Sequence, residues 1–258
     1  MDVPAGFWDE LRAAPRALLA LDYDGTLAPF RAERRAARPY PGVGELIDAI
    51  SREAGTRVVV VSGRPPREAA GLLGLASPPE VWGSHGWERL HASGAIDRRP
   101  VPPAARAALD VAARAAAADG WRERLEVKHA SVALHWRGDR DPPRAAAAGH
   151  AILAPYADGR WLEVLEFAAG LELRCRGWHK GHVLKQLLSE EPGAVVAYLG
   201  DDATDEDAFR ELVARPRCLP VLVAPTPRPT AAACRLVPPG ELRAFLVRWS
   251  QVRGRSQP

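Results

Sequence analysis

Residues 18–26, LLALDYDGT, decide the fold of this chain. The apolar run from Arg16 to Leu21 is typical of a strand buried on both faces of a parallel sheet. Two carboxylates, Asp22 and Asp24, follow this run where Gly25 permits a sharp turn of the backbone. Ligands bind beyond the carboxyl ends of strands in open α/β sheets, so this stretch predicts a site of chemistry rather than of packing.

Strands and helices are expected to alternate on both sides of this stretch. The expected strands are Thr56 to Val61, Ala194 to Leu199 and Cys218 to Val223. The expected helices are Gly42 to Ala54, a stretch beginning at Pro66, Lys180 to Leu188, Thr204 to Val213 and Pro239 to Trp249. This rhythm is typical of helices that cover a parallel sheet, so we expect both ends of the chain to contribute to one sheet.

The middle of the chain has a different pattern. Two alanine-rich helical stretches alternate there with four strand-like pieces: Pro103 to Ala118, Arg144 to Tyr156, Leu125 to Lys128, Ser131 to Trp136, Trp161 to Phe167 and Leu171 to Cys175. We therefore expect an α/β protein in which residues 1–100 and 178–258 form a core domain and residues 101–177 form an inserted α/β domain.

Composition indicates a globular protein with a sizeable core. The chain has 258 residues, of which 47% are hydrophobic, and a formal net charge of +3 from arginines spread along its length. No apolar stretch is long enough to cross a bilayer, and the N-terminus lacks a signal-like pattern. The three cysteines are odd in number and widely spaced. We expect a cytoplasmic monomer with free thiols and neither a nucleic-acid nor a membrane partner.

A second acidic segment, GDDATDE at residues 200–206, follows another apolar run. If the two strands are neighbours, Asp201 and Asp202 converge on Asp22 and Asp24. Carboxylates gathered in one cleft raise one another's pKa unless a cation lies among them. Ligands that are all oxygen, with room for water and a phosphate, favour Mg²⁺ over zinc.

Ser62 and Lys180 are candidate phosphate ligands. Ser62 follows an expected strand, where its hydroxyl and the Gly63 backbone N–H can donate hydrogen bonds to a phosphate oxygen. A Ser-Gly pair is also an ordinary turn, and Lys180 can equally lie on a solvated surface. Phosphoryl transfer among carboxylates needs a fixed cation, which favours a catalytic role for the lysine.

These segments, in this order, resemble the four motifs of the haloacid dehalogenase superfamily. The particular residues in and around these segments resemble one family within this superfamily, the trehalose-6-phosphate phosphatases. The matching stretches are LDYDGTLAP at 21–29, VSGR at 61–64, GSHGWE at 83–88, EVK at 126–128 and GDDATDEDAF at 200–209. The resemblance extends from about Leu18 to Trp249.

The resemblance implies a Rossmann-like core with an α/β cap inserted after the third strand. It also implies a Mg²⁺-dependent phosphatase that hydrolyses trehalose 6-phosphate, the last step of trehalose biosynthesis. Asp22 would attack phosphorus to form an aspartyl phosphate, and Asp24 would act as acid and then as base. The residues implied around the metal are Asp22, the Asp24 backbone carbonyl and Asp201, with Asp202 and Asp205 supporting them. Those implied on the phosphoryl group are Ser62 and Lys180.

Sugar specificity would lie in the cap, where the resemblance assigns the distal glucose to Glu126, Lys128 and Glu172. Charged groups suit sugar hydroxyls because charge-assisted hydrogen bonds are strong and directional. Other residues implied at the substrate are Tyr23, Gly25, Gly63, Arg64 and His85. His135, Ser131, Glu88 and Arg137 also lie in matching stretches. Cys175 stands where family members often have a proline before the lysine motif.

Three other functions share these motifs. The core motifs do not contact the sugar, so the substrate could be a glucosylglycerate, sucrose or pseudo-disaccharide phosphate. A phosphomutase would use the same core chemistry. A silent domain that regulates a trehalose-phosphate synthase would be a non-enzyme, but the nucleophile, acid/base, lysine and metal carboxylate are all present here.

Overall fold

A computed structural model describes residues 3–31, 33–167 and 169–254. The chain divides into two compact units. The core unit comprises Met1–Asp97 and His179–Pro258, and the inserted unit comprises Arg98–Trp178. The breaks expected after residues 100 and 177 lie within a few residues of this division. Among the described residues, no helix is long and apolar enough to cross a membrane.

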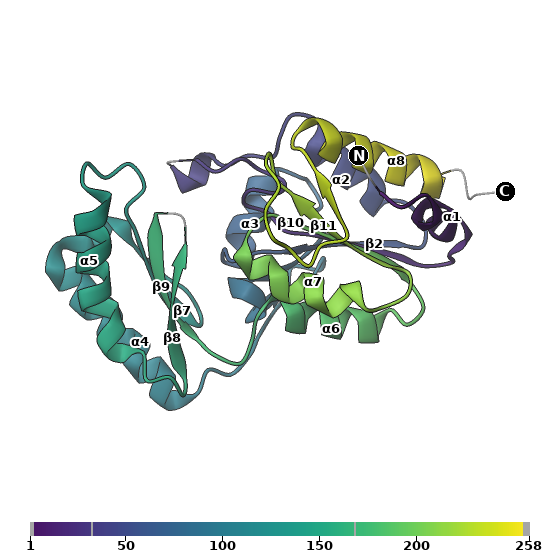
Figure 1. The fold of residues 1–258 in the computed structure, drawn as a ribbon. Helices are drawn as coiled ribbons and strands as arrows, with labels where there is room; N and C mark the ends of the chain where they lie inside the picture. Colours follow the sequence, from purple (N-terminus) through teal and green to yellow (C-terminus); the bar gives the residue numbers. More distant parts are fainter. Residues whose placement is uncertain (1–2, 32, 168, 255–258) are drawn as a thin grey trace. The chain divides into compact units, whose positions relative to one another are not determined.

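An eight-stranded sheet forms the centre of the core unit, in the order β12-β11-β10-β1-β2-β3-β4-β5 (Figure 1). Its strands are β1 (Ala17–Leu21), β2 (Thr56–Val61), β3 (Glu80–Gly83), β4 (Glu88–Leu90), β5 (Ile96–Arg98), β10 (Val195–Gly200), β11 (Cys218–Val223) and β12 (Cys234–Leu236). Every pairing from β12 to β3 is parallel, and β4 runs antiparallel to β3. The expected parallel sheet is therefore confirmed, with an antiparallel strand beside it.

The register of the central strands brings their carboxyl ends to one edge. Leu21 of β1 pairs with Leu199 of β10 and with Val60 of β2. The backbone continues this alignment, because Asp22 N donates to the Leu199 carbonyl at 2.8 Å. The polar residues that follow β1, β2 and β10 therefore begin at the same level of the sheet.

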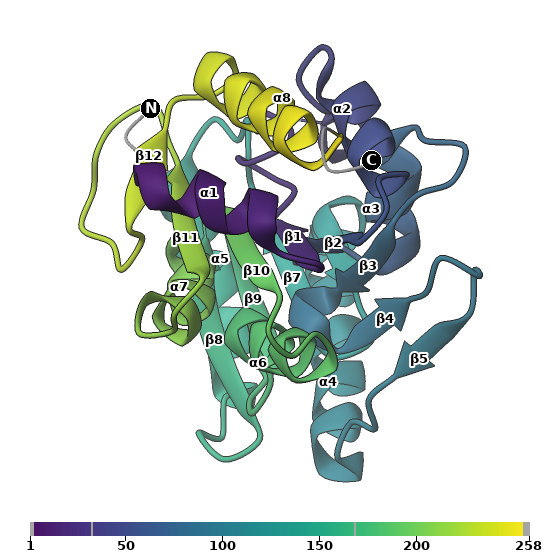
Figure 2. The ribbon, with the colours of Figure 1, turned by 90° about the vertical axis from the view of Figure 1, so that its right-hand side faces the viewer.

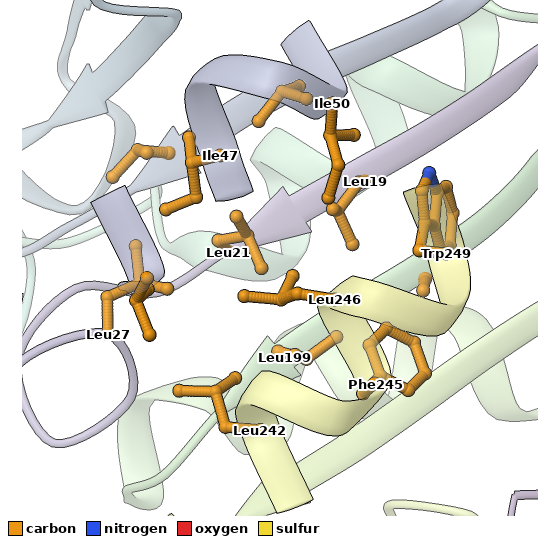
Figure 3. Close-up of a cluster of buried hydrophobic side chains, with 14 of the residues drawn as sticks. Leu19, Leu21, Leu27, Ile47, Ile50, Leu199, Leu242, Phe245, Leu246 and Trp249 are labelled. Atoms are coloured by element: carbon orange, nitrogen blue, oxygen red, sulfur yellow. The ribbon is translucent and has the colours of Figure 1, made fainter. Parts of the chain in front are cut away.

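Helices cover both faces of this sheet (Figure 2). On one face lie α1 (Ala5–Ala13), α2 (Val43–Ser51) and α8 (Gly240–Gly254), and α3 (Pro66–Leu73) shares their hydrophobic cluster. On the other lie α6 (Lys180–Glu190) and α7 (Glu206–Val213). All five residues of β1 are consequently buried. Figure 3 shows the core against α8, formed by Leu19, Leu21, Leu27, Ile47, Ile50, Leu199, Leu242, Phe245, Leu246 and Trp249.

The inserted unit is a four-stranded antiparallel sheet, ordered β6-β7-β9-β8, with two helices. Its strands are β6 (Leu125–Val127), β7 (Ser131–His135), β8 (Leu162–Phe167) and β9 (Gly170–Cys175), and its helices are α4 (Pro103–Ala116) and α5 (Pro142–Leu153). Gly149 of α5 lies against Leu134 and Leu171. Side chains alternate along strands, so Ala133 and Glu172 point to the opposite face of the sheet.

The expected α/β class and the inserted α/β unit are confirmed. One expectation is wrong: the insertion does not follow the third strand, because β4 and β5 come between β3 and the inserted unit. An antiparallel strand joins a sheet through a short turn, so it adds to an edge without a crossover helix. The structure also adds α1, β3 and β12 to the elements whose residue ranges were expected from the sequence.

Candidate active site

Asp22 lies directly after β1 and is 3% exposed. Its Oδ1 accepts a hydrogen bond from Lys180 Nζ at 2.7 Å, and its Oδ2 accepts one from Thr26 Oγ1 at 3.1 Å. Burial raises the pKa of Asp22 to about 8, although the Lys180 ammonium opposes this shift. Lys180 is itself buried at the start of α6, so its ammonium is held in place beside Asp22.

Asp205 connects this pair to the segment that follows β10. Its Oδ1 accepts hydrogen bonds from Lys180 Nζ at 2.7 Å and from the Tyr198 hydroxyl. Its Oδ2 accepts the backbone N–H groups of Asp201, at 2.9 Å, and Asp202, at 3.0 Å. Both oxygens are thus occupied, Oδ1 by two side chains and Oδ2 by the backbone of the turn after β10. Tyr198 was not identified as a site residue from the sequence. The one feature that could have indicated it is a polar hydroxyl within an otherwise apolar strand.

The carboxylates of Asp22, Asp201 and Asp205 fit a metal ion. One oxygen of each lies within 4.8 Å of the others. Gly25, at φ 86°, makes room for them, because a Cβ there would lie 1.9 Å from Asp201 Oδ2. Burial, followed by the charge of Asp22, raises the pKa of Asp201. A hard cation with oxygen ligands, such as Mg²⁺, would neutralise buried carboxylates that repel one another in this way.

Asp202 serves the backbone in this structure. Its Oδ1 accepts hydrogen bonds from the Thr204 N–H at 2.8 Å and from the Thr204 hydroxyl at 2.7 Å. It therefore caps the short helical turn Ala203–Asp205 that precedes α7. A cap that orders this turn also orders Asp205 within it.

The Asp24 carboxylate pairs with Arg64. Arg64 Nε donates to Asp24 Oδ2 at 2.6 Å and Arg64 Nη2 donates to Asp24 Oδ1 at 2.7 Å, which is a bidentate ion pair. Arg64 Nη1 also donates to Glu68 at 2.5 Å. The ring of Tyr23 is fully buried beneath this arginine, and its hydroxyl donates to the Ala37 carbonyl at 2.8 Å. A substrate contact by Tyr23 would therefore fall to its backbone.

The turn after β2 packs directly on the turn after β3. Ser62 Oγ accepts a hydrogen bond from the Arg64 N–H at 3.1 Å, and the Ser62 carbonyl accepts one from the His85 N–H at 3.0 Å. A Cβ on Gly63 would lie 2.8 Å from the His85 ring, so only glycine permits this approach. Accepting from Arg64 leaves the Ser62 hydroxyl proton able to donate.

The predicted sugar-binding residues gather on one face of the inserted sheet. Lys128 Nζ donates to Glu172 Oε1 at 2.7 Å and lies 3.7 Å from Glu126 Oε2. Ser131 Oγ donates to the same Glu172 oxygen at 2.6 Å, and His135 Nε2 lies 2.9 Å from Glu126 Oε2. The strand register explains the cluster, because Glu126 and Glu172 both pair with the position of Ala133.

Arg137 follows β7 and is exposed. The structure thus brings together two groups of predicted residues, one in each unit. The first is the core group around Asp22, and the second is the inserted-unit cluster, by which we mean Glu126, Lys128, Ser131, His135 and Glu172.

The fold is similar to that of solved haloacid dehalogenase-like hydrolases. A solved hydrolase of that class from Bacteroides thetaiotaomicron aligns over 93% of this chain and 99% of its own, with a TM-score of 0.61 and 18% identity. The C-terminal domain of Candida albicans trehalose-6-phosphate phosphatase aligns over 96% and 95%, with a TM-score of 0.77 and 22% identity. At these identities the likeness establishes the fold alone.

A sequence model of the trehalose-phosphatase family matches residues 20–236, and the chain belongs to this family. A trehalose-phosphate phosphatase of Mycobacterium bovis is 33% identical over 266 residues, and a bifunctional trehalose-6-phosphate synthase/phosphatase of Thermoproteus tenax is 34% identical over 224 residues. These alignments cover 93% and 83% of this chain but only 62% and 29% of the relatives, so the chain spans only part of their length.

Proposed function

We propose that this chain is a Mg²⁺-dependent phosphatase that hydrolyses trehalose 6-phosphate to trehalose and phosphate, the last step of trehalose biosynthesis. The observation that carries the proposal is the buried Asp22, hydrogen-bonded to Lys180 and gathered with Asp201 at the carboxyl end of β1. Family membership supports the reaction, and the relatives named trehalose-phosphate phosphatase support the substrate.

In the first step, a carboxylate oxygen of Asp22 attacks phosphorus as the bond from phosphorus to the sugar oxygen breaks. Asp24 gives its proton to that leaving oxygen, so trehalose departs as an alcohol and Asp22 becomes an aspartyl phosphate. Lys180 and Ser62 hold the phosphoryl oxygens. Lys180 has little freedom to move away, because Asp22 and Asp205 both accept from its ammonium.

In the second step, water attacks phosphorus and the bond to Asp22 breaks. Asp24 takes the proton from the water, and both carboxylates return to their starting state with inorganic phosphate released. The Asp24 oxygen that gives and takes the proton has to face the leaving oxygen and then the water, whereas both Asp24 oxygens accept hydrogen bonds from Arg64 in this structure. Asp24 must therefore loosen its contact with Arg64 during the cycle.

Asp22, Asp201 and the Asp24 backbone carbonyl would hold the Mg²⁺ ion, with Asp205 orienting Asp201. When bound, the ion supplies positive charge that offsets the charge of the carboxylates and of the phosphoryl group. Asp205 is better suited to orientation than to ligation, because four donors already occupy its two oxygens.

The inserted-unit cluster would bind sugar hydroxyls. Lys128 and Glu172 offer a donor and an acceptor that already bond to each other, so a sugar hydroxyl can join them in a charge-assisted network. Another sugar phosphate remains the alternative substrate, because the core residues would act on the phosphoryl group and the leaving oxygen, which all sugar phosphates share. The buried nucleophile, lysine and acidic cluster argue against a silent regulatory domain.

The test is phosphate release from a panel of sugar phosphates by the purified chain with Mg²⁺. We expect trehalose 6-phosphate to have the highest kcat/KM, and Asp22→Asn to abolish turnover while the fold is retained, because the amide keeps the shape but cannot attack phosphorus. EDTA should abolish the activity and Mg²⁺ should restore it. Near-normal phosphate release by folded Asp22→Asn would remove this residue from its role, and preference for another sugar would overturn the substrate.

A further inference from the structure

Arg228 contacts the backbone of the acidic segment that carries Asp201. It lies in the loop between β11 and β12. Its Nε and Nη2 donate to the Asp201 carbonyl at 3.2 and 3.1 Å, and Nη2 also donates to the Asp202 carbonyl at 2.9 Å. One rigid guanidinium therefore donates hydrogen bonds to two consecutive carbonyl groups. A lysine ammonium could not reproduce this planar arrangement of donors.

Glu206, in the first turn of α7, orients this arginine. Its Oε1 accepts a hydrogen bond from Arg228 Nη1 at 2.5 Å, and its Oε2 accepts one from the Ala231 N–H at 2.9 Å. One carboxylate thus binds both the guanidinium and the backbone of the loop that carries it. Glu206 is 12% exposed and Arg228 is 29% exposed, so the pair is only partly screened by solvent.

The peptide groups of Asp201 and Asp202 are consequently held from two sides. Asp205 Oδ2 accepts their N–H groups, and Arg228 donates to their carbonyls. With both the donors and the acceptors of this turn occupied, its backbone has little freedom to rotate. The direction of the Asp201 side chain follows from that backbone, and this side chain is one of the three carboxylates that fit a metal ion.

We propose that Arg228 is a positioning residue, which holds Asp201 in the orientation where its carboxylate joins Asp22 around a divalent cation, and that Glu206 orients Arg228 for this task. The inference rests on the proposed Mg²⁺ site and goes beyond it by assigning two residues that contact neither phosphate nor sugar. None of the sequence motifs contains Arg228.

The direction in which cation affinity changes when Arg228 is removed distinguishes positioning of Asp201 from a simple effect of charge. A positive charge near a cation site repels the cation, so removing Arg228 would tighten cation binding if its charge were what mattered. If Arg228 instead positions Asp201, its removal weakens binding. Loss of groups that orient metal ligands typically costs about ten- to a hundredfold in metal affinity.

The experiment measures Mn²⁺ binding to the purified chain by electron paramagnetic resonance, without substrate. We expect Arg228→Met to weaken Mn²⁺ binding about tenfold or more, Arg228→Lys to recover part of the loss, and Glu206→Gln to weaken binding by a smaller factor. In turnover of a sugar phosphate, the Mg²⁺ concentration for half-maximal rate should rise by the same factor, while kcat at saturating Mg²⁺ stays near that of the unaltered chain.

The matched control is Arg215→Met. Arg215 also donates to a backbone carbonyl, that of Glu211 at 2.8 Å, but at the far end of α7. We expect its removal to leave Mn²⁺ affinity unchanged. Equal or tighter binding by folded Arg228→Met would overturn the inference alone. If Arg228→Met does not fold, unchanged affinity in Glu206→Gln overturns it instead. Absence of Mn²⁺ binding by the unaltered chain would overturn the proposed metal site and the inference with it.

Discussion

At the scale of single residues, Asp205 organises the candidate site. A buried carboxylate is costly unless each oxygen finds donors, and here an ammonium, a phenol and two backbone N–H groups supply them. Asp205 thereby fixes Lys180 against Asp22 and fixes the turn that bears Asp201. The sequence indicated an acidic segment, but which oxygen faces which donor depends on distant residues such as Tyr198.

Two buried tyrosines test this account. Tyr198→Phe removes a hydrogen bond to the Asp205 carboxylate, and Tyr23→Phe, its control, removes one to the neutral Ala37 carbonyl. Because hydrogen bonds to charged groups contribute more, we expect Tyr198→Phe to lower the free energy of unfolding by about 1.5–3 kcal/mol and Tyr23→Phe by about 0.5–1.5 kcal/mol. Urea denaturation measures both. Equal losses of unfolding free energy would mean that the charge of Asp205 does not strengthen its hydrogen bond from Tyr198.

At the scale of elements, the sequence predicted most of the core unit. The strands β1, β10 and β11 are largely apolar runs and β2 ends in four buried valines, a pattern typical of a parallel sheet covered by helices. The strands β4 and β5 went unpredicted because each has only three residues, which is too few to show a clear period. The pairing of Asp24 with Arg64 was also beyond prediction, since it depends on side-chain rotamers rather than on spacing.

The charged residues of the inserted sheet can be tested by kinetics on two substrates. Lys128→Ala and Glu126→Ala should reduce kcat/KM for trehalose 6-phosphate by about ten- to a hundredfold, because each loses a charged hydrogen bond worth about 1.5–3 kcal/mol. Turnover of p-nitrophenyl phosphate should barely change, since this ester has no sugar for these residues to bind. Parallel kinetics on both substrates give the comparison.

The control for these variants is Arg174→Ala on the same face of the sheet. Arg174 pairs with Glu163 at 2.8 Å, outside the inserted-unit cluster, and its loss should leave both rates near those of the unaltered chain. If both substrates fell together in Lys128→Ala, the residue would serve folding or the core chemistry. If neither fell, the sugar contacts would lie elsewhere.

At the scale of the whole molecule, the acidic cluster links stability to pH and to metal. The folded, metal-free chain has a raised pKa for Asp22, about 8, so between the ordinary value of 3.8 and this value the folded state holds a proton that the unfolded state has lost. Stability of the metal-free chain therefore falls as pH rises through this window. A cation that binds only the ionised carboxylate competes with this proton, so it binds more tightly as pH rises.

We consequently expect Mg²⁺ to raise the melting temperature more at about pH 8.5 than at about pH 6. Thermal unfolding with and without Mg²⁺ at both pH values measures this difference. Asp22→Asn has no carboxyl group to titrate at this position, so its Mg²⁺ shift should be smaller and should depend less on pH. A larger Mg²⁺ shift at the lower pH in the unaltered chain would contradict the assignment of Asp22 to the metal.

The most direct test of the central claim is rapid acid quenching of the chain during turnover of trehalose 6-phosphate, followed by mass spectrometry of its peptides. The account predicts that the peptide containing Asp22 gains the mass of one phosphoryl group. It also predicts that Asp24→Asn accumulates this species from p-nitrophenyl phosphate, whose leaving group departs without a proton from Asp24, because the variant lacks the base for the second step. Release of phosphate with no phosphorylated Asp22 peptide in either protein would contradict the account.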